Sequence, residues 1–196
     1  MMMAIALKEM EFMREQAVKD VEKEFLEPSF KYLVKNGLEN TSVRDLCKEM
    51  GISYGSIYYW FEGKDDIYIS VVKYGTGRVA KKLLDMAFDK MQNPKLFFDS
   101  FLEEIDKYKM ELRLIFQVTT SPIYGDRMRD KAEDFKSVYE KYIIKLAQIV
   151  GCEPEDMEPI IYMLISILVD YVVWEDYEVS KLQLKFLYNI MSSKTK

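Results

Sequence analysis

The chain has 196 residues, 49% hydrophobic and 31% charged, a composition that predicts a soluble globular protein with one or two well-packed domains. Its net charge of −5 argues against a protein that coats nucleic acid through bulk positive charge. It contains no histidine, which removes the usual general base, the commonest zinc ligand and any Ser-His or Cys-His nucleophile pair. We therefore expect no enzyme, no metal site and no cofactor.

The two cysteines, Cys47 and Cys152, lie far apart in the sequence. The N-terminus lacks a signal-peptide pattern, because its apolar stretch is short and runs directly into charged residues. We expect two reduced thiols in a cytoplasmic protein.

The first predicted helices lead up to a glycine. Residues 4–26 carry apolar residues at helical spacing, and Pro28 suits the first turn of a second helix. Asn36-Gly37 predicts that this helix ends at a left-handed residue. The segment 8–27 holds more acids than bases, so we expect a solvated helix there and not an arm in the minor groove.

Residues 41–64 begin with the pattern of a short amphipathic helix. Val43, Leu46, Cys47 and Met50 repeat at i, i+3, i+4 and i+7. Either Thr41 or Ser42, directly before them, can cap the helix start through its side-chain oxygen.

A glycine turn and a second short helix follow in the same stretch. Gly51 supplies the turn, and Ser53 is a cap for a helix over Tyr54–Trp60. Ile57 is expected to face the core, and we expect Trp60 to pack against the preceding helix. The remaining polar and aromatic residues then face outward, which is the helix-turn-helix pattern.

After Lys64 the pattern stays helical to the end of the chain. No window alternates strictly for long enough to suggest a sheet, so the predicted fold class is all-α. The predicted helices cover residues 64–91, 96–107, 110–118, 126–150, 155–175 and 179–191. Gly75-Thr76-Gly77 should interrupt the first of these, because two glycines cost roughly 1 kcal/mol each relative to alanine.

Residues 160–174, IIYMLISILVDYVVW, are apolar on nearly all sides. The stretch is too short to span a bilayer and contains Asp170, so we expect no membrane segment. A helix that is apolar on more than one face must bury more than one face. We predict that it packs against its own core and against a second subunit of a homodimer.

Two short motifs suggest enzymatic alternatives. Gly75–Ala80 fits the dinucleotide-loop pattern GxGxxA, but the second strand with an acidic residue that this loop requires is missing. Ser70–Lys73 fits SxxK without its companion motifs. A nucleotide-binding enzyme stays open as an alternative reading.

From about Phe25 to Tyr68 the sequence resembles the N-terminal domain of TetR/AcrR-type transcriptional regulators. The resemblance is carried by Gly37, Thr41-Ser42-Val43, Leu46, Gly51-Ile52-Ser53, Gly55-Ser56-Ile57-Tyr58, Phe61 and Lys64. Trp60 replaces the family's usual histidine, and Cys47 its usual alanine. The N-terminal extension is longer than the family norm.

The resemblance implies a set of DNA contacts. Ser42 and Arg44 would touch phosphate, and Lys64 would bind phosphate together with the N-terminal amides of its helix. Base edges would be approached by Tyr54, Gly55 and Ser56, with Gly55 permitting close approach, while Tyr58 and Tyr59 would reach the backbone or thymine methyls. The second helix has no Arg, Lys, Asn or Gln, so we expect specificity to depend on tyrosines, backbone contacts and DNA shape.

The resemblance also implies two domains: a helix-turn-helix domain over 1–75 with its N-terminal helical extension, and a helical ligand-binding and dimerisation domain over 76–196. Aromatic residues of the second domain, with the many methionines, can line an adaptable cavity. The expected lining residues are Phe97, Phe101, Tyr108, Phe116, Tyr139, Tyr142, Tyr171 and Trp174.

The predicted protein is a homodimeric repressor of a near-palindromic operator in double-stranded DNA, released by a small apolar or cationic effector. The effector would change the spacing of the two DNA-binding domains through the long helix that starts at Lys64, with a hinge at Gly75-Thr76-Gly77. The main alternative is a helical adaptor that kept the fold without binding DNA, which the acidic net charge favours.

Overall fold

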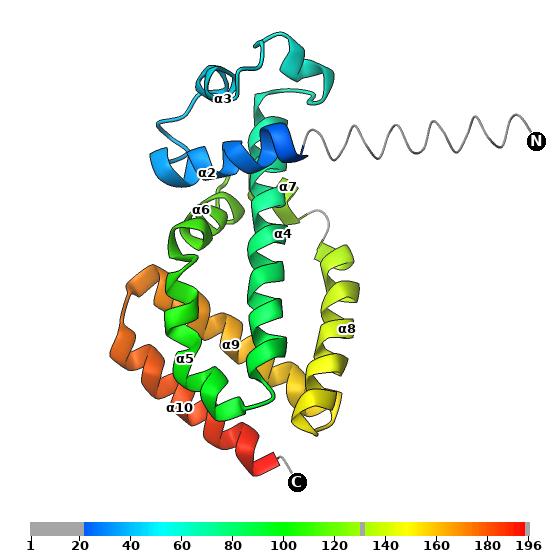
Figure 1. The fold of residues 1–196 in the computed structure, drawn as a ribbon, viewed down its shortest axis with the longest axis vertical. Helices are drawn as coiled ribbons and strands as arrows, with labels where there is room; N and C mark the ends of the chain where they lie inside the picture. Colours follow the sequence, from blue (N-terminus) through cyan, green and yellow to red (C-terminus); the bar gives the residue numbers. More distant parts are fainter. Residues whose placement is uncertain (1–21, 130–131, 195–196) are drawn as a thin grey trace, which may run out of the picture. The chain divides into compact units, whose positions relative to one another are not determined.

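The structure, a computed structural model, describes residues 22–129 and 132–194, and the side chains of 132–139 lie outside this description. Every regular element in the described part is a helix, which confirms the predicted all-α fold class (Figure 1). The elements are η1 (Glu22–Leu26), α2 (Glu27–Asn36), α3 (Val43–Glu49), η2 (Ser56–Tyr59), α4 (Lys64–Lys90), α5 (Pro94–Asp106), α6 (Lys109–Thr119), α7 (Gly125–Arg129), α8 (Ala132–Val150), α9 (Pro154–Trp174) and α10 (Tyr177–Lys194). Most of the helix predicted over 4–26 falls outside the described residues.

The chain divides into two compact units. The first contains the residues up to Gly77 together with Leu114–Met128, and the second contains Arg78–Arg113 together with the residues from Arg129 onward. The division falls inside α4, directly after Gly77. The predicted functional boundary at residues 75/76 stays a prediction.

In the first unit, α2 begins as the sequence suggests. Pro28 lies in the first turn of α2, as predicted. Gly37 ends α2 with a φ of +82°, and its N–H donates to Leu33 O at 2.8 Å. Its ψ of 151° places it outside the left-handed helical region that the sequence suggested.

The core of the first unit connects the helix-turn-helix to its neighbours. Phe25 packs against Phe61 with ring centroids 5.6 Å apart, and both rings are buried. The buried Tyr68 hydroxyl donates to Thr41 O at 2.6 Å, which ties α4 to the segment before α3. Burial raises the pKa of Tyr68 to about 12.

Helix α4 is continuous through Gly75-Thr76-Gly77, so the predicted interruption is wrong. Gly75 has a packing reason: a Cβ there would overlap the ring of the fully buried Phe30. Thr76 stays helical because its hydroxyl donates to Val72 O at 2.8 Å. Close packing of α4 on α2 therefore accounts for Gly75 better than a break does.

In the second unit, α9 contacts α8 and α10, and α5 contacts both α9 and α10. Figure 1 shows α10 running beside α5. Asn93 caps α5 by accepting from Leu96 N at 3.3 Å. Within the helix predicted over 126–150, the described residues form α7 and α8, and residues 130–131 lie outside the description.

Helix α9 ends in a network of polar contacts. Its C-cap, Glu175, has left-handed angles (φ 57°, ψ 23°) and forms an ion pair with Arg113. Arg113 Nε also donates to Val172 O at 3.3 Å, which satisfies a carbonyl of the last turn. Tyr171 donates to Asp106 at 2.8 Å, and burial, with this hydrogen bond, raises the pKa of Tyr171 to about 12.

Among the described helices, α9 is the one whose length and composition would allow it to cross a bilayer. The apolar stretch was expected to be too short, but the helix has 21 residues and a mean hydropathy of 1.6 over its best window. A core helix gives the same signal, and α9 buries Ile160, Leu164 and Val172 inside the second unit. The signal is weak evidence for a membrane span.

Candidate nucleic-acid interface

The start of α3 is fixed by a reciprocal pair of hydrogen bonds. Ser42 Oγ accepts from Asp45 N at 3.2 Å, and the Asp45 carboxylate accepts from Ser42 N at 2.8 Å. This capping box satisfies two amides of the first turn. The hydrogen bonds from the Ser42 side chain and backbone lower the pKa of Asp45 below its usual range. Ser42 is therefore the cap of the two candidates, while Thr41 is buried and donates to Gly37 O at 2.8 Å.

The second helix of the motif is shorter and tighter than predicted. Instead of an α-helix over Tyr54–Trp60, the chain forms a single 3₁₀ turn over Ser56–Tyr59. Ser53 begins it, because its Oγ accepts from Ser56 N at 3.1 Å. The Ser56 hydroxyl donates to Ser53 O at 2.9 Å, so part of its capacity is used locally. Ile57 is fully buried, as predicted, and anchors the turn.

Three of the predicted DNA-contacting side chains form one cluster. The Tyr58 hydroxyl donates to the Tyr54 hydroxyl at 3.0 Å, and the two rings meet edge to face with centroids 5.5 Å apart. The Arg44 guanidinium lies 5.2 Å from the centroid of the Tyr54 ring. The hydrogen bond to Tyr54 raises the pKa of Tyr58, so the Tyr58 phenol stays protonated at physiological pH. All three side chains are exposed.

Next to this cluster, two large aromatic side chains project from the surface. Tyr59 is 88% exposed, and Trp60 is 51% exposed. The prediction that Trp60 packs against the preceding helix is therefore wrong. The 3₁₀ turn ends before Trp60, and the next residue, Phe61, occupies the core position against Phe25. Its exposure makes Trp60 a candidate contact that the sequence pattern missed.

Gly55 has room around it. Its backbone is helical (φ −75°, ψ −36°), and a Cβ there would meet no described heavy atom within 4 Å. Neither backbone strain nor packing in the free chain requires glycine at this position. The open space is consistent with the close approach of a partner, which stays a prediction.

Lys64 opens α4 and lies with its ammonium 5.6 Å from the Tyr68 ring centroid. It lines a cleft of about 530 Å³ with Thr41 and Tyr124 inside the first unit. Within the described chain no carboxylate lies in ion-pair distance of Lys64 or of Arg44. Both cations are therefore available to an external anion.

Acidic residues limit how strongly this end of α4 can attract phosphate. Asp65 and Asp66 directly follow Lys64 in the first turn. Asp66 is partly neutralised, because it accepts from Glu62 N at 3.0 Å and pairs with Arg127 at 3.3 Å. The candidate surface is thus aromatic with two available cations, and it is not a basic patch.

The side chains expected to line an effector cavity have different surroundings in the described part of the chain. Phe97 and Phe101 are buried and meet edge to face with ring centroids 5.5 Å apart, and Tyr171 is buried and donates to Asp106. Tyr142 stacks on Phe88, while Trp174 is 75% exposed. Tyr108 is half-buried, Phe116 belongs to the first unit, and the side chain of Tyr139 lies outside the description. The effector site stays a prediction.

Comparison with known proteins agrees with the local geometry. The sequence model of the bacterial regulatory proteins of the tetR family matches residues 26–71. The chain is 26% identical over 104 residues to the uncharacterised HTH-type transcriptional regulator YuxN of Bacillus subtilis (strain 168), and 22% identical over 115 residues to the HTH-type transcriptional regulator PksA of the same organism. These matches cover 49% and 57% of this chain, but only 35% of YuxN and 56% of PksA.

The likeness in fold extends over both units. A TetR transcription regulator from Haloarcula marismortui ATCC 43049 superposes with a TM-score of 0.53 at 16% identity, covering 90% of this chain and 97% of that one. At this identity the likeness shows the fold alone. The match over residues 26–71 shows that this segment is similar to the N-terminal domain of the tetR family of bacterial regulatory proteins.

Proposed function

We propose that the chain is a homodimeric transcriptional repressor that binds a near-palindromic operator and is released by a small-molecule effector. One observation carries the proposal: a TetR-type domain displays the exposed cluster of Arg44, Tyr54 and Tyr58 beside the projecting Tyr59. Two serines hold this display in place: Ser42 caps α3, and Ser53 Oγ accepts from Ser56 N in the turn that leads into η2. Exposed aromatic rings on a rigid turn are costly in water unless a partner covers them.

On DNA each group has a distinct task. Arg44 and Lys64 bind phosphates, and these contacts set the orientation of the domain on the duplex. Tyr54, Tyr58 and Tyr59 contact base edges or thymine methyls in the major groove, where a phenol offers an apolar ring and a polar hydroxyl. With two phosphate-binding cations in each protomer, the slope of log affinity against log salt should be roughly −4.

Dimerisation is supported by an exposed apolar face of the second unit. On α10 it consists of Val179, Leu182 and Phe186, at i, i+3 and i+7, and on α9 of Tyr162, Met163, Val169 and Val173. We refer to these seven residues as the apolar face. The two helices contact each other, so their stripes can be buried together against the same stripes of a second copy. Two DNA-binding domains would then reach successive major grooves, about 34 Å apart.

The effector would act through α4, the helix that belongs to both compact units. A ligand that binds one arrangement of the units better than another shifts their equilibrium, and the operator must shift ligand affinity reciprocally. Since Phe97, Phe101 and Tyr171 are closely packed, entry of an effector among them would require these rings to move.

A gel-shift titration with the DNA upstream of the chain's own gene tests the proposal. The intact protein should retard this DNA, and Lys64→Ala combined with Tyr54→Ala should abolish the retardation. Lys31→Ala is the matched control, because Lys31 lies on α2 in the same unit and pairs only with Glu27 across one helical turn. It should leave the affinity unchanged.

The competing function is a helical adaptor that does not bind DNA. It is favoured by the acids around the candidate surface, namely Asp45, Asp65 and Asp66, and by the net charge of −5. If upstream and unrelated DNA are both left unshifted while a sizing column shows folded dimer, the adaptor function is supported and the repressor is not.

A further inference from the structure

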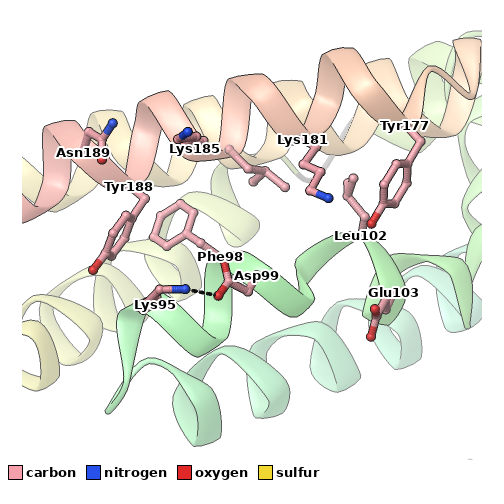
Figure 2. Close-up of a pocket in the computed structure, with 11 residues that line it drawn as sticks. Lys95, Phe98, Asp99, Leu102, Glu103, Tyr177, Lys181, Lys185, Tyr188 and Asn189 are labelled. Atoms are coloured by element: carbon pink, nitrogen blue, oxygen red, sulfur yellow. Dashed lines mark hydrogen bonds and ion pairs between the residues drawn. The ribbon is translucent and has the colours of Figure 1, made fainter.

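A groove runs between α5 and α10 in the second unit, and none of the residues named in the effector prediction is among those that line it. Its volume is about 470 Å³, within the range of sites that hold small organic molecules. The floor is apolar and aromatic: Phe98, Leu102 and Leu184 are buried, and the rings of Tyr177 and Tyr188 form its two ends (Figure 2). Phe98 and Tyr188 are in contact, with ring centroids 5.6 Å apart.

The charges along the groove are asymmetric. Lys95 and Asp99 neutralise each other in an ion pair on α5. Lys181 and Lys185, on α10, have no carboxylate of the described chain within ion-pair distance. Figure 2 shows the Lys181 ammonium directed toward α5, over the groove, and the Glu103 carboxylate directed away from α10. The positively charged Lys181 ammonium therefore lies over the apolar floor of the groove.

From this arrangement we propose that the groove binds an anionic amphiphile, a molecule with an apolar chain or ring system and one carboxylate. The apolar body lies on Phe98, Leu102 and Leu184, where its burial supplies most of the affinity. The carboxylate pairs with Lys181, and Lys185 adds to the positive potential. This ligand class differs from the apolar or cationic effector that the sequence suggests.

The groove and the apolar face use opposite sides of α10. Successive helical residues are rotated by roughly 100°, so Tyr177, Lys181 and Tyr188 share one side of the helix. Val179, Leu182 and Phe186 lie about half a turn away on the other side. Pairing of two copies through the apolar face would therefore leave the groove open to solvent. The inference concerns binding alone and does not rest on the proposed regulatory function.

Isothermal titration calorimetry of the full chain, with decanoate below its micellar concentration, tests the proposal. The three probes share the same ten-carbon chain and differ in the head group. Decanoate should bind more tightly than decanol because its carboxylate can pair with Lys181. Decyltrimethylammonium should bind more weakly than either because its positive charge is repelled by the lysines. The double variant Lys181→Gln/Lys185→Gln should lower decanoate affinity by about tenfold, the effect of two partly exposed charges, and leave decanol affinity unchanged. Lys141→Gln, an exposed lysine on α8, is the matched control and should change neither affinity.

A second variant tests the apolar floor. Tyr188 is half-buried and borders solvent, so Tyr188→Ala should preserve the fold, as circular dichroism can verify, while weakening decanoate and decanol alike. The proposal is overturned if decanoate does not bind, if the double lysine variant binds it as tightly as the unaltered chain, or if the ammonium probe binds as well as decanoate.

Discussion

At Gly55 the effect of a substitution on DNA binding can be measured separately from its effect on stability. Its surroundings are open and its backbone is helical, so alanine fits without strain. Replacing a glycine at such a position stabilises the fold by about 0.4–1 kcal/mol, because the unfolded chain loses freedom. We expect Gly55→Ala to keep or slightly raise the free energy of unfolding, yet to weaken operator binding about tenfold if DNA approaches the backbone there.

The two effects are measured by urea unfolding and by gel shift on the same preparation. Gly77→Ala is the control, since Gly77 is also helical with open surroundings but lies well along α4 from the candidate surface. Equal operator affinity for Gly55→Ala and the unaltered chain would show that DNA keeps its distance from this residue.

At the scale of single elements, the two glycines of α4 differ in whether a larger side chain fits. A Cβ at Gly75 would overlap the buried Phe30 ring, whereas a Cβ at Gly77 would meet nothing within 4 Å among the described residues. We expect Gly75→Ala to destabilise the protein by about 1–3 kcal/mol through overpacking, partly offset by better helix propensity. Gly77→Ala should stabilise it by about 0.5–1 kcal/mol. Urea unfolding of both variants is the measurement, and a stabilised Gly75→Ala protein would contradict the close packing of α2 and α4.

Caps and helix ends could be predicted because they depend on neighbouring residues alone. Ser42 and Pro28 lie at the helix starts that the sequence assigned to them. The error at η2 arose where tertiary packing decides the outcome. Phe61, and not Trp60, is buried against Phe25, and Trp60 is exposed. Helical periodicity in the sequence does not indicate which of these two neighbouring aromatic residues will be buried.

The same limit applies to the second unit. Its helices and its apolar α9 follow from periodicity, but which rings face each other depends on how the helices pair. Phe97 and Phe101 meet edge to face within α5, and the groove between α5 and α10 is lined by residues that no local pattern connects. An aromatic residue at a core-facing position predicts burial, and it does not predict a cavity.

At the scale of the whole molecule, the apolar face should determine whether the protein can act on a palindromic site. Leu182 and Phe186 are each 67% exposed. A twofold dimer through the apolar face would bury both side chains of both protomers. Burying a leucine or phenylalanine side chain stabilises an interface by about 1.5–3 kcal/mol. Leu182→Lys combined with Phe186→Lys should therefore weaken self-association by more than about 100-fold.

Sedimentation equilibrium at micromolar concentration should then find monomer for this double variant and dimer for the unaltered chain. Leu96→Lys is the control, because Leu96 is a comparably exposed apolar residue on α5 outside the apolar face. A monomer presents one half-site contact in place of two, so operator binding should fall together with self-association. If the double variant stays dimeric, another surface joins the protomers. If it becomes monomeric yet shifts the operator with unchanged affinity, DNA recognition does not require the dimer.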